Sequence, residues 1–228
     1  MNDHVQLSSE GTVSVLRMDN GENRMNDRWL TAMGAALDEI EAGDDPLALV
    51  TTGSGRFFTN GLDLGWLAGK GQTAMREFVT GVERLFARII EAPFVTVAAC
   101  NGHTYAAGAM LALCHDFRVM RQDRGYFCLP EVDLGIPFTA GMDALIKQRL
   151  PLVTAHEVMV TGKRYGGLEA AEKQIVHEAV SDERVLPRAI EIASEHAGKN
   201  RANLRAIKSR MYGQLLELLR SSDGTAQP

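Results

Sequence analysis

Residues 94–118 constrain the fold more than any other stretch, because they join a buried strand to a helix through unusually small residues. The strand is predicted at residues 94–99, which are apolar or favour strands, and a turn follows at Asn101-Gly102. A helix is predicted from Ala106, and residues 106–109 give it a first turn with almost no side chains. The free N–H groups of that turn are open to another backbone or to a ligand. Tight packing on the sheet and ligand binding fit this stretch equally well.

The rest of the chain alternates short strands with amphipathic helices. This alternation predicts an α/β fold with right-handed crossovers. Because the C-terminal part is purely helical, we predict a core over residues 1–180 and a helical region over residues 181–228. Further strands are predicted at residues 12–18, 47–52, 117–121 and 175–180, and helices at residues 26–42, 75–90, 139–150, 153–161, 168–173, 184–196 and 201–220.

The composition excludes several classes of function. A net charge of −5 over 228 residues gives no general attraction to nucleic acid or to anionic membranes. No apolar run approaches the ~18 residues of a membrane span, and the N-terminus has no signal-peptide pattern. The three cysteines form no C-x-x-C pair or cysteine–histidine cluster, which argues against a disulfide framework or a zinc site. We therefore expect a cytoplasmic protein without a metal.

Glu131 is the first candidate for chemistry from the residues themselves. It lies in the apolar, proline-bounded segment 129–137, where desolvation disfavours the carboxylate and tunes a general base towards neutral pH. A glutamate that is simply exposed on a loop fits the sequence equally well. The glycine-rich segment 51–56 lacks phosphate-loop spacing, and His115 is expected to be structural. The basic residues of the last helix are expected on a solvated face: Arg201, Arg205, Lys208 and Arg210.

Three motifs occur in order between residues 57 and 136. Residues 57–64 read FFTNGLDL, residues 101–118 read NGHTYAAGAMLALCHDFR, and residues 130–136 read PEVDLGI. Together they resemble the signatures of the crotonase superfamily, the enoyl-CoA hydratases and isomerases. The likeness covers about residues 12–180, and it implies a spiral ββα core followed by a C-terminal helical region. It also implies an acyl-CoA substrate and a homotrimer or dimer of trimers.

The resemblance implies the following site residues. The backbone N–H groups of Leu62 and Ala107 would hold the thioester oxygen as it becomes an enolate, and Glu131 would act as the acid and base. No metal and no cofactor beyond the coenzyme A moiety of the substrate is implied. Coenzyme A contacts carry over by position to Arg24, Met25, Thr59, Asn60, Gly61 and Leu64, and the acyl pocket is expected at Trp66, Met110, Phe138 and Met142.

The chain departs from the superfamily pattern at two places. Residues 106–108 are Ala-Ala-Gly where three glycines are usual, and Met110 stands where hydratases have their first catalytic glutamate. A thioether cannot activate water, so one remaining glutamate suits a Δ3,Δ2-enoyl-CoA isomerase of fatty acid metabolism. The motifs are most similar to the plant-type single-glutamate isomerases. Hydration or other acyl-CoA chemistry, and an inactive acyl-CoA-binding protein, remain as alternatives.

Overall fold

The structure, a computed structural model, describes residues 4–43 and 47–221. Its larger sheet is six-stranded, and all neighbouring strands are parallel except the antiparallel pair at its N-terminal edge. The strand order is β1 (Val5–Glu10), β2 (Val13–Met18), β3 (Ala48–Gly53), β5 (Val95–Cys100), β7 (Phe117–Arg121) and β9 (Glu178–Val180).

A second, three-stranded parallel sheet has the order β4 (Phe57–Thr59), β6 (His103–Tyr105) and β8 (Phe127–Cys128). Each of its strands follows directly on a strand of the larger sheet: β4 follows β3, β6 follows β5, and β8 follows β7. The chain therefore spirals, and each turn adds one strand to each sheet. Because the small sheet is parallel, the carboxyl ends of its three strands lie side by side, about 5 Å apart from strand to strand.

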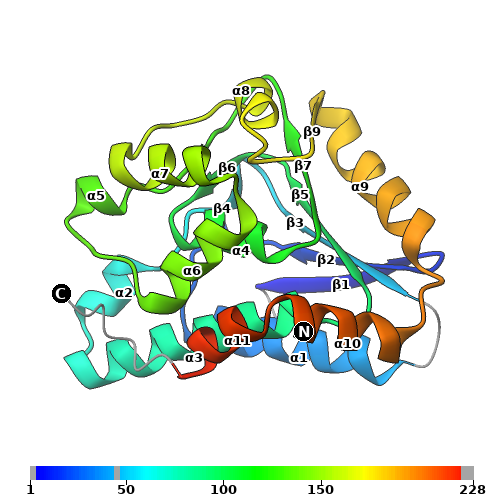
Figure 1. Ribbon diagram of the computed structural model, residues 1–228, viewed down its shortest axis with the longest axis horizontal. Helices are drawn as coiled ribbons and strands as arrows, with labels where there is room; N and C mark the ends of the chain where they lie inside the picture. The colour runs from blue at the N-terminus through cyan, green and yellow to red at the C-terminus, as the bar shows by residue number, and fades with distance from the viewer. Residues whose placement is uncertain (1–3, 44–46, 222–228) are drawn as a thin grey trace.

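Helices cover both faces of the larger sheet (Figure 1). α9 (Asp182–His196) lies alone on one face, where Val13, Val15 and Val97 form a separate apolar cluster with it. The other face carries the main core, and α4 (Ala107–Cys114) sits at its centre with all of its residues buried. α3 (Gln72–Ile90) and α6 (Ala140–Arg149) pack directly on α4. The same core includes residues of α1 (Asp27–Ala42), α2 (Leu64–Ala68), α7 (Leu152–Thr161) and α8 (Gly167–Glu172), and the short helix α5 (Glu131–Leu134) packs on α7.

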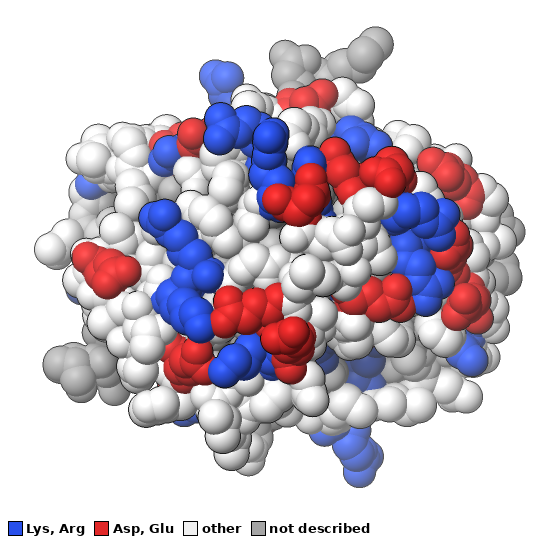
Figure 2. All heavy atoms as spheres, turned by 90° about the horizontal axis from the view of Figure 1, so that it is seen from above, with Lys and Arg blue, Asp and Glu red and all other residues white. Residues whose placement is uncertain are grey.

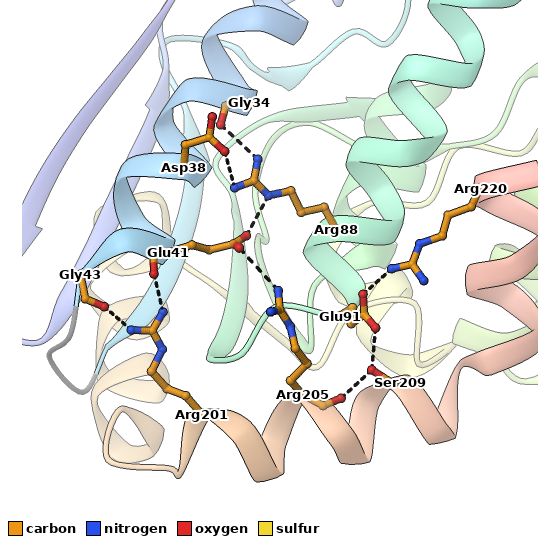
Figure 3. Close-up of polar contacts among 10 residues, drawn as sticks. All are labelled: Gly34, Asp38, Glu41, Gly43, Arg88, Glu91, Arg201, Arg205, Ser209 and Arg220. Atoms are coloured by element: carbon orange, nitrogen blue, oxygen red, sulfur yellow. Dashed lines mark hydrogen bonds and ion pairs between the residues drawn. The ribbon is translucent and has the colours of Figure 1, made fainter.

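Ion pairs fasten the last two helices, α10 (Arg201–Met211) and α11 (Gly213–Ser221), to α1 and α3 (Figure 3). Glu41 at the end of α1 accepts from Arg88 of α3 at 2.8 Å and pairs with Arg205 of α10 at 3.5 Å. Glu91, directly after α3, accepts from the Ser209 hydroxyl at 2.6 Å and pairs with Arg220 of α11. The C-terminal helices are thus held on the core of their own chain.

Lys208 corrects one expectation about this region. Its side chain does not lie on a solvated face: the residue is only 4% exposed. Its ammonium group donates to the Asp116 carboxylate at 2.7 Å and to the Phe94 carbonyl at 2.9 Å. The predicted helix over residues 201–220 is also two helices, because it breaks at Tyr212.

Most predicted elements are present, and the α/β spiral is confirmed. Strands β1, β4, β6 and β8 were not predicted; β6 directly follows the turn predicted at Asn101-Gly102. Among the helices of residues 4–43 and 47–221, none combines the length and the apolar character needed to cross a bilayer. The face over α7, α8 and α9 interleaves acidic and basic side chains (Figure 2), and many of them form ion pairs, such as Lys163–Glu169 and Arg188–Glu178. The domain boundary at residue 181 stays a prediction.

Candidate active site

A cavity of about 490 Å³ opens at the carboxyl ends of the small sheet. The segments that follow β4, β6 and β8 supply Leu62, Ala107 and Glu131 to its wall, and each lies two or three residues beyond its strand. Parallel strands bring these segments together although they are far apart in sequence. Open parallel sheets commonly bind ligands at this edge. The three residues assigned to the chemistry by their motifs therefore share one cavity.

The N–H group of Leu62 takes no part in the backbone pairing between its segment and the segment around Met25. Residue 62 forms an isolated parallel bridge with Met25, in which Met25 N donates to Gly61 O at 2.8 Å and Asp63 N donates to Met25 O at 2.9 Å. This pairing uses the groups on either side of Leu62, so the Leu62 N–H points away from Met25. Leu62 itself lines the cavity, which makes this N–H group a candidate donor to a ligand there.

Ala107 is the first residue of α4, so its N–H has no partner within the helix. The residue before it, Ala106, has φ 52° and ψ −125°, a conformation that costs a non-glycine residue about 1–3 kcal/mol. Ala106 N donates to Cys128 O at 2.9 Å, and Ala109 N donates to Ala106 O at 2.9 Å, so hydrogen bonds on both sides hold the strained residue. The strain turns the chain sharply from β6 into α4 and brings the start of the helix to the cavity.

Glycines allow the two donor segments to touch. A Cβ atom added at Gly61 would lie 3.1 Å from Ala107 N and 2.9 Å from Tyr105 O, and Gly61 has φ +79°. One added at Gly108 would lie 2.7 Å from the Thr59 side chain. Gly108 therefore permits close packing of α4 on β4, and Ala107, on the cavity wall, carries an N–H group without a partner in the helix.

Glu131 opens the short helix α5 and is 7% exposed. Its Oε2 atom is buried and has no hydrogen-bond partner among the described residues. Burial raises the pKa of this carboxyl from its ordinary 4.5 to about 7. A group with that pKa changes its protonation state near neutral pH, as a general base must. The structure therefore shows Glu131 buried, and not simply exposed on a loop.

Glu131 is the only carboxyl-bearing residue on the cavity wall within the part of the chain that the structure describes. Met110, predicted for the acyl pocket, also lies on this wall and is 1% exposed. Met142 joins it from α6, so two flexible thioether side chains face the same space. The cavity is therefore largely apolar around one acid.

Sequence reasoning missed one wall of the cavity. Gln72, Met75, Arg76 and Val79 of α3 all line it, at the i, i+3, i+4, i+7 spacing of a single helix face. Met75 and Val79 were recognised only as part of the apolar face of a predicted helix. That spacing was the available signal, but periodicity alone does not tell a cavity wall from a core face.

The cavity mouth carries basic and amide side chains. Arg24, Asn60 and Leu64, all predicted to contact coenzyme A, line it. Glu22 orients two of them: its carboxylate accepts from Arg24 Nε at 2.7 Å and from Asn60 Nδ2 at 2.8 Å. With Arg76, two guanidinium groups border the opening, an arrangement suited to phosphate oxygens.

Five predicted site residues lie behind the wall or beside it. Met25 is fully buried, and Thr59 donates its hydroxyl to Asn23 O at 2.7 Å while it accepts from Gly61 N at 3.1 Å. Trp66 packs edge-on against Phe78, with ring centroids 4.9 Å apart. The structure does not bring Met25, Thr59, Gly61, Trp66 and Phe138 onto the cavity surface itself, and their predicted contacts stay predictions.

Three other titratable residues weighed in the sequence, His115, Asp63 and Asp133, do not line the cavity. His115 is buried between the Leu111 carbonyl and the Thr51 hydroxyl, both at 2.9 Å, and burial lowers its pKa to about 4. Asp63 caps α2 by accepting from Trp66 N at 3.0 Å, and Asp133 is exposed. Over the described residues, no three His, Cys, Asp or Glu side chains gather in a way that could hold a metal ion.

Comparisons with known proteins agree with this geometry. The sequence profile of the enoyl-CoA hydratase/isomerase family matches residues 8–222. Enoyl-CoA delta isomerase 3 of Arabidopsis thaliana is 34% identical over 179 residues, which is 75% of each chain. Two solved structures of one Mycobacterium tuberculosis protein are each 31% identical to this chain. The first has a TM-score of 0.90, with 97% of this chain and 93% of its own chain covered. The second has a TM-score of 0.89, with 98% of this chain and 97% of its own chain covered. One is named "probable enoyl-CoA hydratase EchA3" and the other an enoyl-CoA isomerase in its apo form. This chain belongs to the enoyl-CoA hydratase/isomerase family of the crotonase superfamily.

Proposed function

We propose that this protein is a Δ3,Δ2-enoyl-CoA isomerase that uses one glutamate as both acid and base. The observation that carries the proposal is the single carboxyl group, Glu131, on a cavity wall that also presents Leu62 and Ala107. A double-bond shift needs one proton moved between two carbons of the same substrate. One carboxyl group is sufficient for that.

The reaction would follow from the placement of three groups. The carboxylate of Glu131 removes a proton from C2 of a 3-enoyl thioester, and the electron pair moves onto the thioester oxygen. The N–H groups of Leu62 and Ala107 stabilise this dienolate; a single preorganised donor of this kind contributes about 3–4 kcal/mol to lowering a barrier. The protonated Glu131 then returns the proton to C4, so that the double bond lies between C2 and C3 and the enzyme is unchanged.

The environment of Glu131 supports both halves of this cycle. Its pKa of about 7 means that the carboxylate and the carboxylic acid are both well populated at neutral pH. The same group can therefore take up the proton and release it without a large energy difference. Its unpaired Oε2 leaves one oxygen available to the substrate.

Hydration of a 2-enoyl thioester is the main rival, and the M. tuberculosis protein of similar fold carries both names. Hydration requires a positioned and activated water molecule, which two carboxylates provide in hydratases. Met110 stands at the position of the first of these two carboxylates, and its thioether cannot take or give a proton. We therefore assign isomerisation ahead of hydration.

Arg24, Asn60 and Arg76 at the cavity mouth support binding of the coenzyme A portion. Their cationic and amide groups match the phosphate and amide groups of that moiety, while the apolar interior matches an acyl chain. The role of each residue in this binding is part of the proposal.

Glu131→Gln tests the mechanism directly. The variant keeps the shape and a hydrogen-bonding group but cannot take up a proton. We expect it to bind a saturated acyl-CoA with unchanged affinity by calorimetry, and to lose conversion of 3-enoyl-CoA, followed as the ultraviolet absorbance of the conjugated product. Asp133→Asn, an exposed carboxyl on the same short helix, is the matched control and should keep full activity. An undiminished rate in Glu131→Gln would remove Glu131 from the mechanism.

Two further assays separate the alternatives. Incubation of the wild type with 2-enoyl-CoA and analysis for 3-hydroxyacyl-CoA tests hydration, and rapid formation of that product would favour a hydratase. An inactive binding protein would bind acyl-CoA and convert none of a panel of 3-enoyl and 2-enoyl thioesters.

We also infer a homotrimer or a dimer of trimers. Leu152, Val153, Val160 and Leu168 on α7 and α8 are between 53% and 80% exposed, which is unusual for large apolar side chains on a free surface. A monomeric mass in light scattering at micromolar concentration would contradict this assembly.

A further inference from the structure

Ala106 adopts a backbone conformation that suits glycine better than alanine. Its φ of 52° and ψ of −125° lie outside the left-handed helical region, in a region open mainly to glycine. The hydrogen bonds that hold it use only backbone atoms: its N–H donates to Cys128 O, and its carbonyl accepts from Ala109 N and Met110 N. Glycine would form the same bonds without strain. The methyl group is therefore the one thing that alanine adds at this position.

Ala106 is also part of the cavity wall. It is only partly buried, unlike the rest of the first turn of α4. A Cβ atom added at Gly61 would lie 3.1 Å from the Ala106 methyl carbon and 3.1 Å from Ala107 N. The methyl group therefore lies next to Gly61, where the loop after β4 approaches the start of α4. Strain at such a place calls for a functional explanation.

Glu131 supplies the same cavity with a carboxyl oxygen that is available to a ligand. Oε2 of Glu131 is buried, lacks a hydrogen-bond partner among the described residues, and belongs to a residue of the same cavity wall. A ligand held by the Ala107 N–H and reached by Glu131 must pass between them. Ala106 belongs to the same wall and directly precedes Ala107, so it is adjacent to any ligand atom held there.

We propose that the Ala106 methyl group restricts the site to acyl thioesters that carry no branch at C2. The inference rests on the proposed function, which puts the thioester oxygen on the Leu62 and Ala107 N–H groups. C2 is bonded to the carbonyl carbon, so it lies next to residue 106. A methyl substituent on C2 would compete for space with the side chain of Ala106, whose position is fixed by the backbone hydrogen bonds of that residue.

The test compares the binding of two unreactive ligands, hexanoyl-CoA and each enantiomer of 2-methylhexanoyl-CoA, by calorimetry. Saturated chains cannot isomerise, so the measurement does not depend on the reaction. We expect the wild type to bind the unbranched ligand about tenfold or more tightly than the branched one, the discrimination that one carbon in a close-fitting pocket provides. Ala106→Gly should bring the ratio close to one by improving only the branched ligand. Ala140→Gly, at an exposed position outside the cavity, should leave the ratio unchanged.

Three outcomes would overturn the inference. Equal affinity of the wild type for both ligands would mean that no selection exists. A ratio that persists in Ala106→Gly would show that another group is responsible. Absence of binding for either ligand would remove the acyl-CoA site and this inference with it. By contrast, if the selectivity is present and responds to Ala106→Gly while 3-enoyl-CoA is not converted, the inference stands and only the proposed reaction fails.

Discussion

Gly61 lies so close to the amide nitrogen of Ala107 that a Cβ added at residue 61 would stand only 3.1 Å from that nitrogen. This contact joins the loop after β4 to the start of α4. It therefore constrains the spacing of the Leu62 and Ala107 N–H groups, because the first is bonded to Gly61 and the second is on the nitrogen that Gly61 approaches. The two donors are positioned by backbone contact, without any side chain of their own.

Gly61→Ala should disrupt that spacing. The new methyl group would lie 2.9 Å from the Tyr105 carbonyl oxygen, and φ of +79° is unfavourable for alanine. We expect kcat to fall about 10²–10³-fold, the loss associated with one misplaced donor, and the free energy of unfolding to fall by about 1–3 kcal/mol. Gly11→Ala is the matched control, because Gly11 has φ +60° and nothing within 4 Å. It should lose stability alone; equal rates for the two variants would contradict the role of the contact.

The activity should depend on the ionisation of Glu131. Burial raises the pKa of this carboxyl to about 7, and the base is the ionised form, whose population grows as pH rises. Therefore kcat/KM for a 3-enoyl-CoA should increase with pH through about 7 and then level off. Initial rates measured across about two pH units on either side of neutrality test this prediction. A flat profile, or an inflection near the ordinary value of 4.5, would argue against a buried base.

The same group should make stability depend on pH. In the unfolded chain the carboxyl ionises near 4.5, whereas in the folded protein it holds its proton until about 7. Stability from this group is therefore complete below 4.5 and is lost as pH rises through 7, by roughly 3 kcal/mol in total. The free energy of unfolding of Glu131→Gln, relative to the wild type, should rise over this range in urea titrations. A constant difference would mean that the carboxyl is not desolvated.

Met110→Glu should add hydration activity. It places a second carboxyl on the wall that now holds only Glu131, at the position occupied by a glutamate in hydratases. We expect 3-hydroxyacyl-CoA to form from 2-enoyl-CoA in this variant and not in Met110→Gln, which has the same size and no charge. Since residue 110 is 1% exposed, a loss of stability is also expected, and both variants should be checked for folding by circular dichroism. A folded Met110→Glu protein without hydration would contradict this role of the position.

Lys208 should be important for stability and not for chemistry. Its ammonium group is buried between Asp116 and Phe94 and lies on α10, away from the cavity wall. Removal of one partner of a buried ion pair typically costs about 3–5 kcal/mol, so Lys208→Met should unfold at markedly lower denaturant concentration. Lys199→Met, an exposed lysine just before α10, should change little. Activity per folded molecule should be the same in both.

Long-range contacts explain why the strands of the small sheet could not be predicted from the sequence. β4, β6 and β8 have only two or three residues each, too few for any periodicity. They exist because each pairs with a strand more than twenty residues away, as Phe57 does with His103. The longer helices and buried strands were predictable because each carries its own pattern. Lys208 was misassigned for a related reason: its partner Asp116 lies 92 positions away in sequence.

The site was predictable where a motif specified the backbone. Leu62, Ala107 and Glu131 were assigned from three separate motifs, and the structure brings them to one cavity. The remaining walls could not be predicted, because helix α3 reaches the cavity only through tertiary packing. Likewise, nothing in the sequence separated Met142, which lines the cavity, from Phe138, which packs beside it.

The use of main-chain donors has a consequence for how this protein can change. An amide N–H is present whatever side chain its residue carries, so substitutions at residues 62 and 107 can alter the space around the acyl group without deleting a catalytic atom. The parts that tolerate little variation are Gly61, Gly108 and Glu131. If the proposed mechanism holds, the choice of acyl chain can therefore change through side chains alone while both backbone donors are kept.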